Sequence, residues 1–246
     1  MAAGNRVVQY YDATAEHYDG LHSIEKNPEH SRAMELGWPL LGRVGSVLDV
    51  GSGTGRSLRW LQERYPGVAL HGVEPSAALL DIARRNLPDA DLRQGIGERL
   101  PYADNSIDVV IATAIMHHAD DPPKIISEMF RVARNGILIS DHNNYAFGGA
   151  LAKRLRMGLR LCGLLGAANY VRNGFKTQGY SEGDGWWYPY SLLDNYAQIA
   201  TLAESTFIFP TRRPTIGLGN LIFSQGHLAI VATKPVVLGR TSAAMR

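Results

Sequence analysis

The chain has 246 residues, of which 45% are hydrophobic, and its formal net charge is +2 at pH 7. This composition suffices for one α/β domain with a full core, and the absence of a basic run argues against a nucleic-acid partner. The single cysteine, Cys162, excludes a disulfide within the chain and suits a reducing compartment. We expect a cytoplasmic protein without stable membrane insertion, because no apolar run approaches ~18 residues and the N-terminus lacks an apolar signal core.

Hydrophobic periodicity predicts strands that alternate with helices along the first part of the chain. The predicted strands are residues 46–50, 69–73, 91–94, 109–113 and 136–140. The predicted helices are residues 57–64, 76–86 and 123–133. Helices of this length between strands indicate parallel βαβ units with right-handed crossovers. Two more strands, residues 207–210 and 227–233, are predicted around a long glycine-rich connection.

The turn after the first predicted strand is the most informative segment. Gly51, Gly53 and Gly55 alternate there, immediately before a helical pattern. Glycine tolerates positive φ and has no Cβ, so a ligand can approach the turn while the helix N-terminus directs free N–H groups at it. A dinucleotide turn reads G-x-G-x-x-G, but position 56 is Arg. The spacing therefore disfavours a pyrophosphate ligand.

Two carboxylates flank this turn in sequence. Asp49 stands two residues before Gly51, where it would repel a phosphate but suit an ammonium group. Glu74 follows the second predicted strand, where a carboxylate can accept hydrogen bonds from ribose hydroxyls. S-adenosylmethionine has an ammonium group, a ribose and no phosphate, so we predict it as the cofactor. Each carboxylate taken alone is equally compatible with a strand-end or helix-cap residue.

In this order the motifs resemble the class I S-adenosylmethionine-dependent methyltransferases, in the small-molecule branch of ubiquinone/menaquinone type (methyltransferase type 11). The resemblance extends over roughly residues 7–142. Its further parts are YYDATAEHYD (10–19), LPYADNSID (100–108), IMHHAD (115–120) and FRVARNGILI (130–139). It implies a three-layer Rossmann-like fold with a mostly parallel seven-stranded sheet, an antiparallel last strand and a helical and loop cap inserted after strand five.

The resemblance also implies one domain with four parts. These are an N-terminal segment that covers the cofactor (1–45), the cofactor-binding core (46–142), the acceptor-binding cap (143–205) and the final strands (206–235). The cofactor residues that it assigns are Tyr11, Tyr18, Asp49, Gly51, Ser52, Gly53, Glu74, Pro75, Gly97, Glu98, Ala112, Thr113 and His117. Where the family commonly has an adenine-binding Asp, this chain has Ile96. The backbone of Ile96 and Gly97, or the Glu98 side chain, would replace it.

The cap contains an aromatic run, residues 179–191, with five aromatic rings, two carboxylates and three glycines. Aromatic faces beside carboxylates suit a sugar, although they also suit a planar aromatic acceptor or plain core packing. The run resembles, less specifically, methyltransferases encoded with bacterial saccharide biosynthesis. The predicted acceptor-binding residues are His118, Asn143, Tyr180, Glu182, Asp184, Trp186, Trp187 and Tyr190.

Residues 151–165 are predicted as one basic amphipathic helix. Its apolar face would hold Leu151, Leu155, Leu159, Cys162 and Leu165, with Lys153, Arg156 and Arg160 largely opposite. A lid helix with a solvated basic face explains this pattern. Peripheral contact with an anionic membrane, or with a phosphorylated or lipid-linked acceptor, is the alternative.

Histidines and an aspartate follow two neighbouring strands and are the candidates for catalysis. Methyl transfer mainly requires alignment, and a hydroxyl acceptor also needs a base. We favour His142 as the base, with Asp141 orienting it or contacting the acceptor, and His117 as its competitor. Each histidine is equally compatible with a hydrogen-bonded loop residue. The spacing of the histidines and aspartates prescribes no coordination geometry, so no metal site is predicted.

The predicted function is O-methylation of a saccharide or another hydroxylated metabolite with S-adenosylmethionine. C-methylation of a quinone-type or aromatic ring is the first alternative. A non-catalytic S-adenosylmethionine-binding module is the second. A homodimer is left open.

Overall fold

The computed structural model describes residues 3–22, 28–212 and 225–235. These residues form a seven-stranded sheet in the order β3-β2-β1-β4-β5-β9-β8. The strands are β1 (Ser46–Val50), β2 (Ala69–Glu74), β3 (Asp91–Gln94), β4 (Ile107–Thr113), β5 (Ala133–His142), β8 (Ser205–Pro210) and β9 (His227–Thr233). Strands β1 to β5 pair in parallel, whereas β9 is antiparallel to both β5 and β8. The predicted fold class is confirmed.

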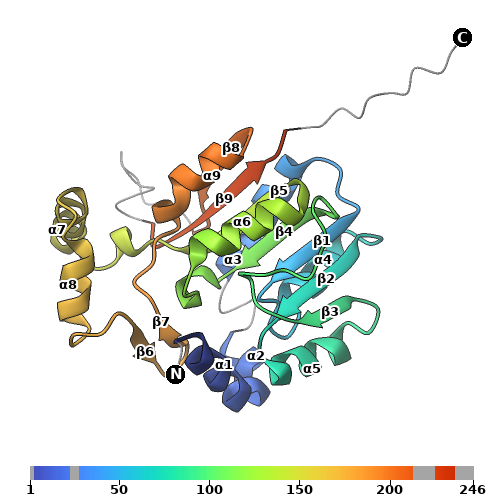
Figure 1. Cartoon of the computed structure of the whole chain (residues 1–246), viewed down its shortest axis with the longest axis horizontal. Coiled ribbons are helices and arrows are strands. Elements are labelled where there is room, and N and C mark those ends of the chain that lie inside the picture. The colour runs from blue at the N-terminus through green and yellow to red at the C-terminus, as the bar shows by residue number, and fades with distance from the viewer. Residues whose placement is uncertain (1–2, 23–27, 213–224, 236–246) are drawn as a thin grey trace, which may run out of the picture.

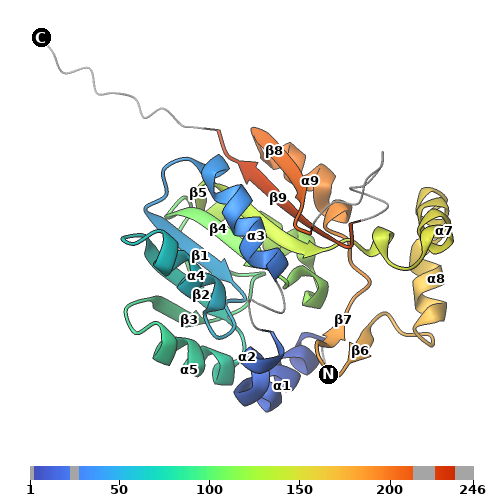
Figure 2. The same cartoon turned by 180° about the vertical axis from the view of Figure 1, so that it is seen from behind.

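Helices cover both faces of this sheet, as the two opposite views in Figure 1 and Figure 2 show. The longer helices around it are α1 (Ala3–Thr14), α3 (Pro28–Gly37), α4 (Arg56–Arg64), α5 (Ala77–Asn86), α6 (Pro122–Val132) and α9 (Tyr196–Leu202). The short helices are η1 (Ala15–His17), α2 (Tyr18–Leu21), η2 (Trp38–Leu41), η3 (Met116–His118), η4 (Asn144–Ala146) and η5 (Leu192–Asn195). Alternating side chains of the central strands face two separate clusters, one with α6 and α9 and the other with α3, α4 and α5.

Most predicted boundaries agree with the structure to within one or two residues. Strand β5 is longer than predicted, because Ala133 pairs with Ile107 of β4 and His142 pairs with His227 of β9. Helix α5 begins one residue later than predicted, because the Ser76 side chain caps it by accepting a hydrogen bond from the Leu79 N–H. Most of the connection predicted between the last two strands lies outside the described residues.

The cap differs from the prediction. The expected helix 151–165 is two helices, α7 (Ala150–Leu161) and α8 (Leu165–Arg172). Gly163 separates them with a φ of +71°, a left-handed conformation that ends a helix. The aromatic run folds as an antiparallel hairpin of β6 (Gly179–Ser181) and β7 (Gly185–Trp187). Among the described residues, no helix has both the length and the apolar character needed to span a bilayer.

The hairpin of β6 and β7 lies beside α1, at the carboxyl ends of the parallel strands (Figure 1). The Tyr10 hydroxyl donates a hydrogen bond to the Glu182 carbonyl, and the Arg6 guanidinium lies 5.4 Å from the Trp186 ring centre. The N-terminal helix and the cap therefore meet at the edge of the sheet where this class of fold places its ligands.

Candidate active site

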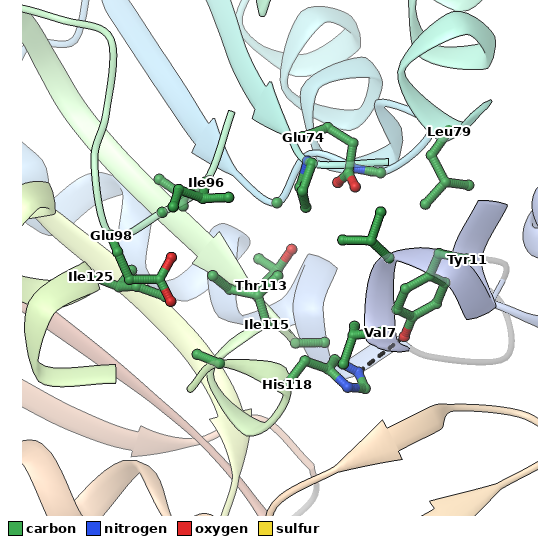
Figure 3. A pocket seen from close by; sticks show the side chains of 18 of the residues that line it. Val7, Tyr11, Glu74, Leu79, Ile96, Glu98, Thr113, Ile115, His118 and Ile125 are labelled. Carbon is green, nitrogen blue, oxygen red and sulfur yellow. Dashed lines mark hydrogen bonds between the residues drawn. The ribbon is translucent and has the colours of Figure 1, made fainter. Parts of the chain in front are cut away.

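A cavity of about 410 Å³ opens at the carboxyl ends of β1, β2 and β4. Figure 3 shows Glu74 and His118 at its wall, with Tyr11 of α1 hydrogen-bonded to His118. The lining residues that were predicted for the cofactor are Tyr11, Tyr18, Gly51, Gly53, Glu74, Pro75, Gly97, Glu98 and Thr113. Because α1 supplies part of the wall, the expectation that the N-terminal segment covers this site agrees with the geometry.

The glycine turn after β1 forms one wall of the cavity. Gly51, Gly53 and Gly55 have φ values of +70°, +54° and +84°. A Cβ on Gly51 would lie 2.5 Å from a methyl carbon of Ile115, and one on Gly53 would lie 3.3 Å from the Tyr18 hydroxyl oxygen. Only glycine combines this backbone with the open space.

The two flanking carboxylates are both buried. Asp49 Oδ1 has no hydrogen-bond partner within the described part of the chain. Glu74 instead accepts hydrogen bonds of 2.9 Å from the backbone N–H groups of Gly53 and Ser76. Glu74 thereby ties the glycine turn to the start of α5.

Burial perturbs both groups strongly. It raises the pKa of Asp49 to about 8, and the neighbouring Glu74 adds to that rise. Burial also raises the pKa of Glu74 to about 7, against the opposing effect of its two backbone hydrogen bonds. A positively charged ligand group would stabilise the ionised form of such a carboxylate. The unpartnered oxygen of Asp49, beside a glycine turn without side chains, thus fits a cationic ligand of the S-adenosylmethionine type.

Four predicted cofactor residues do not line the cavity: Asp49, Ser52, Ala112 and His117. Ala112 packs in the hydrophobic core, and Ser52 is buried. Sequence reasoning missed several apolar lining residues, namely Val7, Val8, Leu79, Ile115 and Ile125. These residues lie close to the recognised motifs in the sequence, and that was the signal that could have identified them. Ile96, in the place of the family's Asp, lines the cavity and is 52% exposed, so it is accessible for apolar contact with a ligand.

The Asp141 side chain pairs with His117 rather than with His142. The distance from Asp141 Oδ1 to His117 Nδ1 is 2.7 Å, whereas His142 Nδ1 lies 4.0 Å away. Asp141 also accepts hydrogen bonds from the backbone N–H groups of Met116 and His142. Asp141 therefore holds His117 directly, and its contact with His142 is the longer one. The cause is the strand period, which sends side chains 141 and 142 to opposite faces, together with the parallel pairing of β4 and β5.

The two histidines have opposite electrostatic surroundings. Burial alone would lower the pKa of His117, but the carboxylates of Asp141 and Asp184 outweigh it and raise the pKa to about 10. Burial and the neighbouring His117 lower the pKa of His142. The two ring centres are 4.3 Å apart, and the His142 side chain is 36% exposed.

Two predicted acceptor residues meet beside the cavity. One is Asp184 of the cap hairpin, and the other is His118 of the segment after β4. His118 lines the cavity and donates from Nδ1 to the Trp186 carbonyl at 2.7 Å. Asp184 lies 3.4 Å from His118 Nε2. Tyr180, Glu182, Trp186 and Trp187 belong to the hairpin or its turn but do not line the cavity.

Asn143 and Tyr190 are structural rather than acceptor-binding residues. Asn143 is fully buried, and its side chain bonds to the Gln225 carbonyl, the Tyr145 N–H and the Ser191 hydroxyl. The Tyr190 ring packs in the core and its hydroxyl donates to Asn195. Their polar atoms are used in holding the cap to the end of β5, so the two predictions are wrong.

Known proteins support the reading of the site. Residues 48–140 match a family model described as a methyltransferase domain. The demethylmenaquinone methyltransferase of Renibacterium salmoninarum is 29% identical over 150 residues, which are 58% of this chain and 62% of that protein. The malonyl-[acyl-carrier protein] O-methyltransferase of Halorhodospira halophila is 32% identical over 130 residues, 50% of this chain and 42% of that protein. The matches thus span less than two thirds of either relative.

A solved structure shares the fold. It comes from Thermotoga maritima, is described as an S-adenosylmethionine-dependent methyltransferase and possible histamine N-methyltransferase, and has a TM-score of 0.60 at 18% identity. It covers 93% of this chain and 99% of its own. Residues 48–140 thus match a methyltransferase domain, and the chain shares the fold of this solved structure.

Proposed function

We propose that the protein transfers a methyl group from S-adenosylmethionine to a hydroxyl of a small molecule, a saccharide or another hydroxylated metabolite. The observation that carries this proposal is the buried, unpartnered Asp49 oxygen directly before the glycine turn, whose Gly51 and Gly53 line the cavity. A cationic group that reached this carboxyl group would stabilise its ionised form. The cytoplasm is the proposed location, and a homodimer stays a prediction.

The residues of the cavity divide the work of holding the cofactor. Asp49 would face the ammonium group, Glu74 the ribose, and Ile96 the adenine ring. The bound cofactor supplies an electrophilic methyl group on a positively charged sulfur. Tyr11 and Tyr18, which line the cavity from the N-terminal segment, would exclude water from it and hold the reacting groups in place. Such alignment contributes roughly 7–11 kcal/mol in favourable cases.

His142 is the proposed base for a hydroxyl acceptor. Its side chain is partly exposed, whereas that of His117 is 2% exposed and lies between Asp141 and Asp184. His142 would accept the proton that the hydroxyl loses, which typically contributes about 10² to 10⁴ in rate. Asp141 would act on this step only through His117 and the backbone of β5.

One observation favours a second function, C-methylation of a quinone-type ring. It is the similarity to a demethylmenaquinone methyltransferase over 150 residues. A non-catalytic cofactor-binding module is the remaining alternative, and the experiment below separates all three.

Calorimetric titration with S-adenosylhomocysteine tests the cofactor site. We expect micromolar binding by the native protein, and weaker binding by Asp49→Ala and Glu74→Ala. Asp89→Ala removes an exposed carboxylate and serves as the control. An absence of binding by the folded native protein would refute the proposal.

An acceptor screen then distinguishes the functions. Methyl transfer is measured with sugars, sugar nucleotides and quinone-type phenols, each with the native protein and His142→Gln. Product from hydroxylated sugars that falls in the variant supports the first function. Product from the phenols alone would replace it with the second, and cofactor binding without any product would leave the binding module.

A further inference from the structure

Two neighbouring histidines share one tautomer. His117 Nδ1 lies 2.7 Å from Asp141 Oδ1, and His118 Nδ1 lies 2.7 Å from the Trp186 carbonyl oxygen. An ionised carboxylate and a carbonyl can only accept hydrogen bonds. Both Nδ1 atoms therefore carry a hydrogen, and in the neutral rings both Nε2 atoms present a lone pair.

One carboxylate lies close to both Nε2 atoms, and His118 Nε2 also accepts a hydrogen bond from the Tyr11 hydroxyl at 3.0 Å, which a bound ion would replace. Asp184 Oδ2 lies 3.4 Å from His117 Nε2, and Asp184 Oδ1 lies 3.4 Å from His118 Nε2. Both distances are longer than a well-formed hydrogen bond. His117 Nε2 is buried and has no hydrogen-bond partner in the described part of the chain. Two ligand atoms that each lie about 2.0–2.1 Å from a tetrahedral metal ion are roughly 3.3–3.4 Å apart. The two nitrogen–oxygen separations, each to a different oxygen of Asp184, are of that size.

We propose that His117 Nε2, His118 Nε2 and the Asp184 carboxylate bind one divalent transition-metal ion. One ligand atom from each residue lies within 4.8 Å of the others. Two imidazoles with a carboxylate suit Zn²⁺, Fe²⁺ or Mn²⁺ better than the all-oxygen preference of Mg²⁺ or Ca²⁺. Asp141 and the Trp186 carbonyl hold the two rings, as outer-shell acceptors do at metal-bound histidines.

The ion would join two parts of the molecule. His117 and His118 belong to η3 of the core, whereas Asp184 lies in the turn of the cap hairpin. Because His118 lines the cavity, the ion would lie at the cavity wall and lock the cap over it. This proposal rests on the ligand geometry and does not depend on methyl transfer.

Metal content of protein purified without chelators, followed by Zn²⁺ calorimetry and Co²⁺ absorption spectroscopy on chelator-treated protein, tests the site. We expect one equivalent of Zn²⁺ and visible Co²⁺ absorption bands. His118→Gln and Asp184→Asn should weaken binding at least ~10–100-fold, the range seen when even outer-shell groups are lost. His71→Gln is the matched control, because His71 also pairs with an aspartate, Asp91, at 3.3 Å.

S-adenosylhomocysteine binding and circular dichroism show whether each variant is folded, independently of metal binding, so each metal-binding outcome is decisive. Zn²⁺ affinity that is equal in native protein and in folded Asp184→Asn would overturn the metal site. So would an absence of stoichiometric binding of Zn²⁺, Co²⁺, Fe²⁺ and Mn²⁺. In that case His117 lies between the two carboxylates as a doubly protonated ring instead.

A different surface supports a second inference. Residues 143–178 contain six Lys or Arg residues and no acidic residue. Helix α7 has no buried residue, and Figure 1 shows α7 and α8 standing away from the sheet. Arg156 and Arg160 bond to Asn144 and Tyr145 of the body. No hydrogen bond or ion pair with another described residue is made by the side chains of Lys153, Arg154, Arg172 and Lys176.

Apolar side chains accompany these charges. Of the 15 exposed large hydrophobic residues in the described chain, eight lie between positions 147 and 175, so the exposure is concentrated here. Leu151 and Leu161 are 80% and 81% exposed. The six most exposed are Leu151, Leu155, Leu161, Leu164, Val171 and Phe175. A nucleic acid would not need these side chains, and a second copy would bring like charges together.

We infer that the face formed by α7 and α8 binds an anionic lipid bilayer. Apolar side chains would enter the headgroup boundary while the surrounding Lys and Arg residues contact anionic headgroups. This orientation would present the cap to acceptors held in the bilayer, a consequence that rests on the proposed methyl transfer. The binding itself does not.

Sedimentation with phosphatidylcholine vesicles, with and without phosphatidylglycerol, tests this face. We expect binding to anionic vesicles that weakens with salt. The double variant Lys153→Gln/Arg154→Gln should lower the partition coefficient by about tenfold or more, from roughly 1 kcal/mol per basic residue. Leu151→Asp/Leu155→Asp should lower it as well, and the exposed Arg59→Gln/Arg85→Gln is the control.

Equal binding to neutral and anionic vesicles, or binding unchanged in both α7 variants, would overturn the inference. Sedimentation velocity without vesicles measures self-association of the protein. Self-association that Leu151→Asp/Leu155→Asp abolishes would assign the face to a second copy of the chain.

Discussion

The core and the cap are held by different forces. Strand β4 places Val109, Val110 and Ile111 at 0% exposure between two layers of helices, and the cavity is built on the ends of such strands. Helix α7, by contrast, buries no residue. The hairpin turn reaches the core through Asp184 and the two histidines of η3. The core around the cavity is thus held by burial, whereas α7 and the hairpin turn of the cap are held by a few polar contacts.

A pair of truncations tests this contrast most strongly. Ile111→Ala should lower the free energy of unfolding by about 2–5 kcal/mol, because it leaves a cavity in the core. Leu155→Ala, at a side chain that is 61% exposed, should change it by less than ~0.5 kcal/mol. Urea denaturation measures both, and comparable losses would show that the cap is packed as tightly as the core.

Asn143 marks the boundary between the two regions. Asn143→Ala removes the partner of the Ser191 hydroxyl and of the Tyr145 N–H, which should cost about 1–3 kcal/mol in unfolding free energy. S-adenosylhomocysteine affinity should stay within about twofold, well under the ~1.4 kcal/mol of a tenfold change. A selective loss of acceptor affinity with unchanged stability would instead restore Asn143 as an acceptor residue.

The pH dependence of the free energy of unfolding tests the burial of Asp49 in the core. The pKa of Asp49 is about 8 in the native protein and ordinarily ~3.9 in an unfolded chain. Between these values the native state binds a proton that the unfolded state has lost, so stability falls as pH rises. When the pH rises from 5 to 8, the free energy of unfolding should fall less in Asp49→Asn than in the native protein. The expected difference is at least ~1.4 kcal/mol, which corresponds to one pKa unit.

Denaturation at a series of pH values, with Asp89→Asn as control, measures this difference. S-adenosylhomocysteine should also release a proton on binding below pH 8, because its ammonium group favours the ionised carboxylate. Binding enthalpies in buffers of different ionisation enthalpy report that proton. Parallel pH profiles of the native protein and Asp49→Asn would contradict the assignment.

Two glycines in the cap permit the finest test. Gly185 has a φ of +68°, and a Cβ there would lie 2.5 Å from the Tyr10 ring of α1. Gly185→Ala should strain the hairpin locally by about 1–3 kcal/mol and speed hydrogen exchange in α1, with a several-fold loss of cofactor-product affinity. Gly183→Ala, where a Cβ meets nothing within 4 Å, should have neither effect. Unchanged exchange in both variants would show that the hairpin does not hold α1.

The sequence predicted what short-range patterns encode. Strand and helix periods located the sheet, and the spacing of Asp49, the glycines and Glu74 identified the cofactor turn, because these residues act through the local backbone. The family resemblance implied a mostly parallel seven-stranded sheet with an antiparallel last strand, and the structure adds its strand order, β3-β2-β1-β4-β5-β9-β8.

Only the tertiary structure decided which distant residues meet. Asp141 pairs with His117, 24 residues earlier, rather than with its neighbour His142. The sequence could not show that Asp184 would lie 3.4 Å from two histidines of the core. Such contacts depend on how the cap packs against η3 and α1, and no residue period or spacing records a distance across the folded chain.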